Sequence, residues 1–78
     1  MKVYLVLGYD LVTGNQNVVD YIAAENEVEA CRKFERRNFN CEANDAFIEG
    51  TLEEFVEDSP DEFSHIVEDL LNQAGAMV

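Results

Sequence analysis

The chain has no tryptophan, one proline and four glycines among its 78 residues. So few prolines and glycines exclude a low-complexity linker. No stretch approaches the ~20 apolar residues that cross a membrane. The early apolar run, residues 3–8, is too short for a signal peptide and is soon followed by Asp10, with no plausible cleavage site after it. These absences favour one domain, residues 1–78, in the cytoplasm.

Cysteine and histidine are also scarce. Cys31 and Cys41 are too few for a disulfide framework, and we expect reduced thiols. With His65 they lack metal-ligand spacing, so we expect no metal and no cofactor. A Cys31–His65 nucleophilic pair is the catalytic alternative, but Cys31 falls on an apolar helical stripe, where a thiol acts as a small hydrophobe. No hydrolase, phosphate-loop or zinc-protease motif occurs, so we expect no enzyme activity and no catalytic residues.

Positive charge is the third shortage. Five Lys and Arg face 17 Asp and Glu, for a net charge of −12, and residues 42–78 contain no Lys or Arg. Such a surface repels nucleic acids and anionic membranes and attracts basic proteins. We therefore expect no direct nucleic-acid binding, no membrane contact and a basic protein as partner.

Acidic residues are abundant in one segment. Residues 42–69 hold 11 of the 17 acidic side chains, and apolar residues recur between them at helical spacing. Hydrophobic residues make up 47% of the chain, which argues against disorder despite the charge. The carboxylates are therefore expected on a folded surface.

Three strands are predicted. Residues 2–9 are rich in β-branched and aromatic residues and apolar on both faces, which is typical of a central strand. A turn at residues 13–15 leads to a second strand, residues 18–23, which pairs back as a hairpin. Residues 38–44 are predicted as a loop, and residues 46–48 as a short third strand.

Three helices are predicted. Asn26 is the expected N-cap of a helix that ends near Arg37. Its apolar stripe is Val28, Cys31 and Phe34, with Ala30 beside it. Thr51 and Glu54 form a capping box for a short helix, residues 52–57. Ser59 is the expected N-cap of the last helix, whose inward stripe is Phe63, Ile66, Val67, Leu70, Leu71 and Ala74. Gly75 should stop this helix, before an apolar tail at residues 76–78.

This order predicts an α+β fold. A three-stranded, mostly antiparallel sheet with helices on one face, in the order ββαβαα, fits the patterns.

Smaller charge features have ordinary explanations. Paired carboxylates such as Glu53–Glu54 lie on polar helix faces, where solvation is expected rather than acid–base chemistry. The run of residues 57–62 does not match a calcium loop. The basic run of residues 32–37 suits an exposed helix face, with Lys33 one turn after Glu29. A homodimer in which the acidic half meets this basic run is an alternative.

The acidic surface has two interpretations. Net charge alone keeps proteins soluble, which is the simpler one. The other is phosphate mimicry, because carboxylates one helical turn apart lie ~5–6 Å from each other, a scale similar to phosphate spacing.

In size, charge and α+β make-up the chain resembles the small acidic inhibitors of phages and mobile elements, the anti-CRISPR and DNA-mimic antirestriction proteins. The resemblance implies a non-enzymatic inhibitor in the host cytoplasm that binds a basic nucleic-acid-handling protein and blocks nucleic-acid access. An oligomeric accessory or adaptor protein, without mimicry, is the alternative. The expected contact residues are Glu53, Glu54, Glu57, Asp58, Asp61, Glu62, Glu49 and Asp45.

Overall fold

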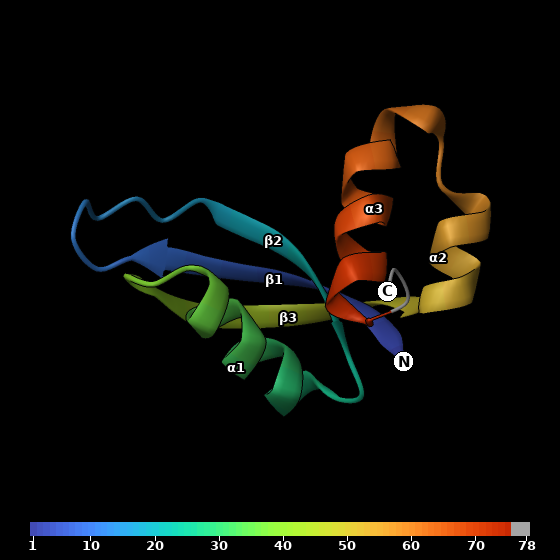
Figure 1. The fold of residues 1–78 in the computed structure, drawn as a ribbon. Helices are drawn as coiled ribbons and strands as arrows, with labels where there is room; N and C mark the ends of the chain where they lie inside the picture. Colours follow the sequence, from blue (N-terminus) through green and yellow to red (C-terminus); the bar gives the residue numbers. More distant parts are fainter. Residues whose placement is uncertain (76–78) are drawn as a thin grey trace.

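A computed structural model describes residues 1–75, and its elements follow the order ββαβαα (Figure 1). They are β1 (Lys2–Asp10), β2 (Val18–Ala24), α1 (Glu27–Arg37), β3 (Cys41–Thr51), α2 (Leu52–Asp58), the 3-10 turn η1 (Asp61–Phe63) and α3 (Ser64–Gln73). This confirms the predicted α+β class and order. Among the described residues, none of the helices has the length and apolar character to span a membrane. The predicted apolar tail, residues 76–78, lies outside the described residues.

The sheet has the strand order β2-β1-β3, and both pairings are antiparallel. β1 is central, as its apolar residues on both faces predict. Val3 and Val6 point to opposite faces, and both side chains are fully buried. The central strand is therefore packed on both sides.

β3 is longer than predicted. The predicted loop of residues 38–44 already enters the strand at Cys41, which pairs with Asp10 of β1. The register shifts at two points, which leaves Asn44 and Glu49 as bulged residues without a partner on β1. Polar residues and two bulges break the alternation along this strand, so the sequence pattern concealed most of it.

The helices lie on both faces of the sheet, and the prediction of helices on one face is wrong in this detail. α1 packs Ala30 and Phe34 on the face that carries Tyr4 and Ile22. α3 packs Leu70 on the other face, with α2 beside it. Figure 1 shows α1 below the sheet and the α2–α3 pair above it. Because β1 is apolar on both faces, each face needs a cover.

The N-cap of α1 is confirmed, but its inward stripe is not as predicted. The Glu29 N–H donates to Asn26 Oδ1 at 2.9 Å. Ala30 and Phe34 are fully buried, whereas Val28 is 60% exposed. Val28 precedes Ala30 by about 200° of helix rotation, which turns its side chain away from the sheet.

The predicted N-cap of α2 is confirmed, and the predicted N-cap of α3 is wrong. The Glu54 N–H donates to Thr51 Oγ1 at 3.2 Å, and the Thr51 hydroxyl donates to Glu54 Oε1 at 2.9 Å. Ser59 is not an N-cap. Its hydroxyl donates to the Phe55 carbonyl and closes the end of α2, so the chain enters α3 through η1. Gly75 stops α3 with a φ of +72°, as predicted.

Candidate functional site: the acidic surface of α2 and η1

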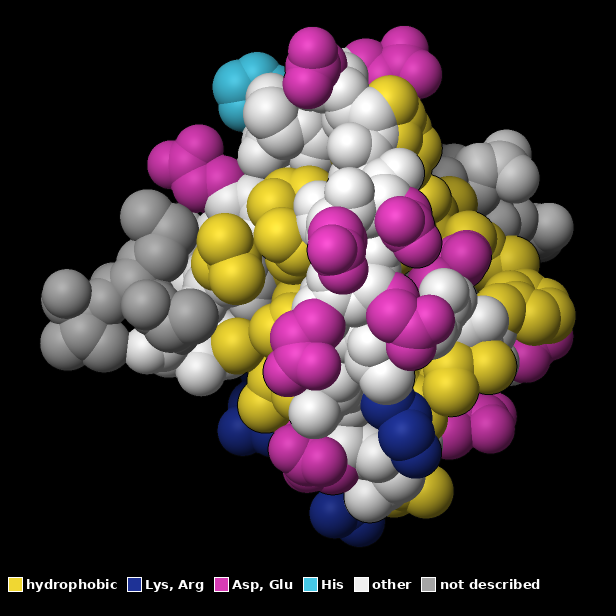
Figure 2. All heavy atoms as spheres, turned by 90° about the vertical axis from the view of Figure 1, so that its right-hand side faces the viewer, with side chains coloured by type: hydrophobic (Ala, Val, Ile, Leu, Met, Phe, Trp, Pro, Cys, Tyr) yellow, Lys and Arg dark blue, Asp and Glu magenta, His cyan; other side chains and the backbone are white. Residues whose placement is uncertain are grey.

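α2 is anchored by its apolar residues and exposes its acidic ones. Leu52 and Phe55 pack against the core formed by Val3, Ala23 and Leu70. The four acidic residues of the helix are exposed: Glu53, Glu54, Glu57 and Asp58. Figure 2 shows acidic side chains gathered over this side of the molecule with hydrophobic side chains on both flanks. Packing of Leu52 and Phe55 on the core thus fixes the position of the helix that carries these carboxylates.

One side of α2 borders a hollow of about 250 Å³. Glu54 and Asp58, one turn apart, line it together with Glu49 from the second bulge of β3. Its remaining lining is Phe55, Ser59, Pro60 and Phe63. The structure thus brings three of the predicted contact residues around one partly apolar hollow.

The other side of α2 borders an apolar groove. Glu53 and Glu57, also one turn apart, flank a space of about 480 Å³. Its apolar lining comes from Leu52, Val56 and Leu71. The carboxylates of α2 therefore form two rows, each beside apolar surface.

The remaining predicted contact residues divide between near and far positions. Asp61 and Glu62 are exposed in η1, which follows α2 after two residues. We call the four acidic residues of α2 together with Asp61 and Glu62 the acidic surface. Asp45 lies elsewhere. It pairs with Leu7, whereas Thr51, next to α2, pairs with Lys2. Leu7 lies five positions after Lys2 along β1, which corresponds to about 16 Å.

An aromatic cluster that was not predicted from the sequence supports this surface. The ring centroids of Phe55 and Phe63 lie 6.4 Å apart, and those of Tyr21 and Phe55 5.5 Å apart. Tyr21 also lies 6.2 Å from Phe63. The cluster fixes α2 and η1 to β2. Tyr21 precedes Phe55 by 34 positions and Phe63 by 42, so the contacts are apparent only in three dimensions. Alternation of Tyr21 with Asp20 was the only sequence signal for it.

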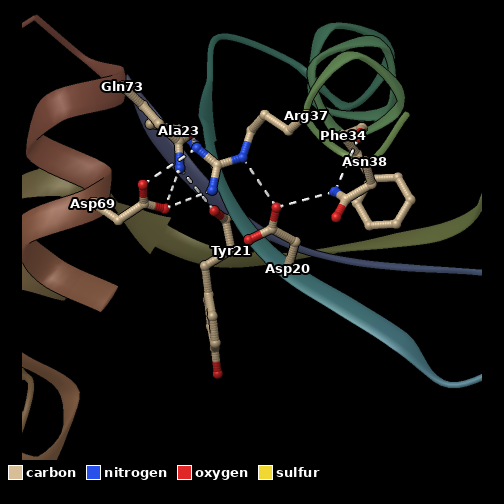
Figure 3. A network of polar contacts seen from close by, with 8 residues as sticks. All are labelled: Asp20, Tyr21, Ala23, Phe34, Arg37, Asn38, Asp69 and Gln73. Carbon is tan, nitrogen blue, oxygen red and sulfur yellow. Dashed lines mark hydrogen bonds and ion pairs between the residues drawn. The ribbon is translucent and has the colours of Figure 1, made fainter. Parts of the chain in front are cut away.

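Two of the four cations of α1, Lys33 and Arg37, form ion pairs away from the acidic surface. Arg37 pairs with Asp20 at 3.0 Å and with Asp69 at 2.8 Å, and Lys33 pairs with Glu29 at 3.3 Å, as predicted. Figure 3 shows Arg37 between the two aspartates. Among residues 1–75, no ion pair reaches a carboxylate of α2 or η1. The acidic surface therefore keeps its charge uncompensated.

Side chains of α1 and α3 hydrogen-bond to the backbone at the outer edge of β2. The Ala23 N–H donates to Gln73 Oε1 at 2.9 Å, and Gln73 Nε2 donates to the Tyr21 carbonyl at 3.0 Å (Figure 3). Lys33 Nζ donates to the Ala23 carbonyl at 2.8 Å. These side chains take the place of a neighbouring strand and leave this edge unsuited to strand pairing.

The thiols and the histidine do not come together. Cys31 is on α1, and His65 is exposed on α3, across the sheet. Burial raises the pKa of the Cys31 thiol, and the charges of Glu27, Glu35 and Asp45 raise it further. A nucleophilic cysteine has the opposite shift. Among the described residues, no group of three His, Cys, Asp or Glu side chains is placed to hold a metal ion.

Comparison with protein-family models, with curated proteins and with solved structures finds no match to this chain. The surface of the chain itself is therefore the basis for its proposed function.

Proposed function

We propose that the chain is a non-enzymatic inhibitor that binds a basic nucleic-acid-handling protein and blocks nucleic-acid access. The observation that carries the proposal is the acidic surface, whose carboxylates have no cation partner among residues 1–75. An uncompensated surface of this kind raises the rate of association with a basic partner and favours such partners over others.

The arrangement of the carboxylates supports phosphate mimicry. Glu53 with Glu57, and Glu54 with Asp58, are one turn apart on α2, and a turn of helix rises about 5.4 Å. One strand of a duplex carries a phosphate about every 3.4 Å, so the two spacings are of similar scale. The apolar groove and the hollow beside α2 offer the dry contacts that a protein interface also needs.

We further propose that the inhibitor acts in the cytoplasm of a host cell, as do the phage-encoded inhibitors that it resembles. Its target there would be a protein whose nucleic-acid groove is lined by Lys and Arg, because such a groove already binds a row of phosphates.

The test compares two variants with the same net charge. Glu53→Lys/Glu57→Lys reverses one row of the acidic surface. Glu25→Lys/Glu68→Lys reverses two exposed carboxylates outside it, one between β2 and α1 and one on α3. Glu54 is left unchanged because its carboxylate accepts the Thr51 hydroxyl at the start of α2. Each protein is used to capture partners from a bacterial lysate, and a captured partner is assayed by gel shift with its nucleic acid.

The wild type and the Glu25/Glu68 variant should displace the nucleic acid, and the Glu53/Glu57 variant should not. Displacement should weaken as salt rises. Equal inhibition by both variants would refute mimicry by the acidic surface.

An oligomeric accessory protein is the second candidate, and exposed apolar side chains on the α1 side of the molecule favour it. Ile48 on β3 and Val28 on α1 are 59% and 60% exposed. Sedimentation equilibrium distinguishes the two functions: a stable oligomer that displaces no nucleic acid from a basic protein would favour the accessory role.

A further inference from the structure

The sheet face opposite α1 is covered over only part of its length. α3 packs Leu70 on Val3 and Ala23 toward one end. Figure 1 shows the other end of this face without a helix above it, in the described part of the chain. Four apolar residues in register make up this uncovered part, which we call the open face: Leu5, Leu7, Val19 and Phe47. Val19 is 53% exposed and Phe47 is 49% exposed.

The border of the open face is acidic. Asp45 pairs with Leu7, and Glu42 pairs with Tyr9, so both carboxylates point to the same side of the sheet as the apolar residues. Glu42 raises the pKa of the Tyr9 phenol, first through a side-chain hydrogen bond and then through its charge. On this side, none of the residues of the three described strands is a Lys or Arg. An occupant should therefore bring apolar side chains flanked by positive charge.

A second copy of the chain is a poor occupant. Two molecules that each carry a net charge of −12 repel one another, and this face adds acidic side chains to that repulsion. An added strand at β3 is also disfavoured, because bulges at Asn44 and Glu49 interrupt the strand and the Ala43 N–H already donates to Glu35 at 3.0 Å.

A helix suits the dimensions of the open face. Three strands spaced about 4.8 Å apart make a surface about 10 Å wide, which one helix covers. From Leu5 to Tyr9 the strand runs about 13 Å, the length of about nine helical residues. α3 shows this mode of packing on the covered part of the same face, where Leu70 is fully buried.

We propose that the open face binds a basic amphipathic helix of a partner protein, whose apolar stripe covers Leu5, Leu7, Val19 and Phe47 while its Lys or Arg residues meet Asp45 and Glu42. The bound helix would complete the helical layer that α2 and α3 begin. This surface is separate from the acidic surface on α2, so the proposal does not rest on the proposed function.

The test uses a synthetic leucine–lysine peptide of about 14 residues with helical periodicity, and a control peptide of the same composition with alternating periodicity. NMR of the labelled chain should show amide shifts on Leu5, Leu7, Val19 and Phe47 with the helical peptide. Fluorescence anisotropy should give an affinity about tenfold higher for the helical peptide than for the alternating one at about 150 mM salt, where charge alone is screened.

Matched variants locate the contact. Val19→Thr/Phe47→Thr places a residue with high strand propensity at both positions and should weaken binding of the helical peptide about tenfold. Leu11→Thr/Val12→Thr changes two exposed apolar residues in the hairpin turn and should change the affinity less than about twofold. Circular dichroism melts check that each variant folds.

Three outcomes would overturn the proposal. They are equal affinity for the two peptides, amide shifts confined to α2 and η1, and concentration-dependent broadening of the open-face amides without peptide, which would make a second copy the occupant. Loss of nucleic-acid displacement in the Glu53→Lys/Glu57→Lys variant concerns the other surface alone, so failures of the two proposals are distinguishable.

Discussion

Arg37 at the end of α1 and Asp69 in α3 form a two-point ion pair, although their helices cover opposite faces of the sheet. The Arg37 guanidinium donates to the two Asp69 oxygens at 3.3 and 2.8 Å. The pair passes around the outer edge of β2, where Asp69 also accepts from Gln73 Nε2 at 3.0 Å. The Asp69 carboxylate thus links Arg37, from the α1 side of the sheet, to the Gln73 amide, which hydrogen-bonds to the outer edge of β2.

The first prediction ranks the members of this network. Gln73→Ala should lower the free energy of unfolding by about 1–3 kcal/mol, because it leaves the Ala23 N–H and the Tyr21 carbonyl without these partners. Asp69→Asn should cost less, at most about 1 kcal/mol, because the Arg37 and Asp69 side chains are 36% and 42% exposed and solvent screens their pair. Urea denaturation measures both, with exposed Asn72→Ala as control. A larger loss of unfolding free energy for Asp69→Asn than for Gln73→Ala would mean that the ion pair, rather than the Gln73 side chain, stabilises the edge of β2.

The second prediction concerns the contact between Gly8 and Phe34. A Cβ at Gly8 would lie 2.5 Å from the Glu42 carbonyl oxygen and 2.5 Å from the Phe34 ring. Phe34 is fully buried, so its ring has little room to move. Gly8→Ala should therefore destabilise the domain by about 1–3 kcal/mol. In a double-mutant cycle, Phe34→Leu should recover part of the loss, and strict additivity of the two changes would contradict the contact.

The third prediction concerns salt. The acidic carboxylates of α2 and η1 repel one another without ion-pair partners among residues 1–75. Raising NaCl from about 10 to about 150 mM should raise the melting temperature, because screening beyond about 8 Å weakens this repulsion. Glu53→Gln/Glu57→Gln should reduce the rise of the melting temperature with NaCl. A melting temperature that falls over this range would mean that ion pairs, rather than repulsion, dominate.

The fourth prediction concerns thiol reactivity. Burial raises the pKa of both thiols, and nearby carboxylates add to this effect, Asp10 in the case of Cys41. A raised pKa leaves less thiolate near neutral pH. Each cysteine should therefore react with iodoacetamide more slowly in the folded chain than in the urea-unfolded chain. Cys31→Ser and Cys41→Ser isolate each site.

The sign of the pH dependence follows from the same shift. Because the folded-state pKa lies above the unfolded value, the neutral thiol contributes stability below the unfolded pKa, and that contribution is lost as pH rises through the folded pKa. The rate difference between folded and unfolded chains should therefore narrow at high pH. A folded chain that reacts faster than the unfolded one near neutral pH would contradict the raised pKa values.

Much of the local structure was predictable from the sequence. Asn26, the Thr51–Glu54 pair and Gly75 mark helix ends because a cap forms between residues three or four positions apart. The two-sided apolar pattern of residues 2–9 predicted the central strand. The exposed carboxylates of α2 followed from helical periodicity in the same way.

Errors arose where a competing partner or the packing of an element decides the outcome. Ser59 has the side chain of an N-cap, but its hydroxyl donates to the Phe55 carbonyl. Val28 fits an apolar stripe, but α1 turns Ala30 and Phe34 to the sheet, which leaves Val28 exposed. Residues 41–44 belong to the predicted loop, yet pairing with β1 places them in β3.

The sequence by itself determined the class of the fold, the order of its elements and a strongly acidic surface, because periodicity, caps and net charge act over a few residues. Only the tertiary structure decided which face each helix covers, since either face of β1 is apolar enough to be buried. It also decided that Arg37 meets Asp69 and that Leu5, Leu7, Val19 and Phe47 form one open face. Those relationships join residues far apart in the chain, and strand register and helix packing, rather than local preference, set them.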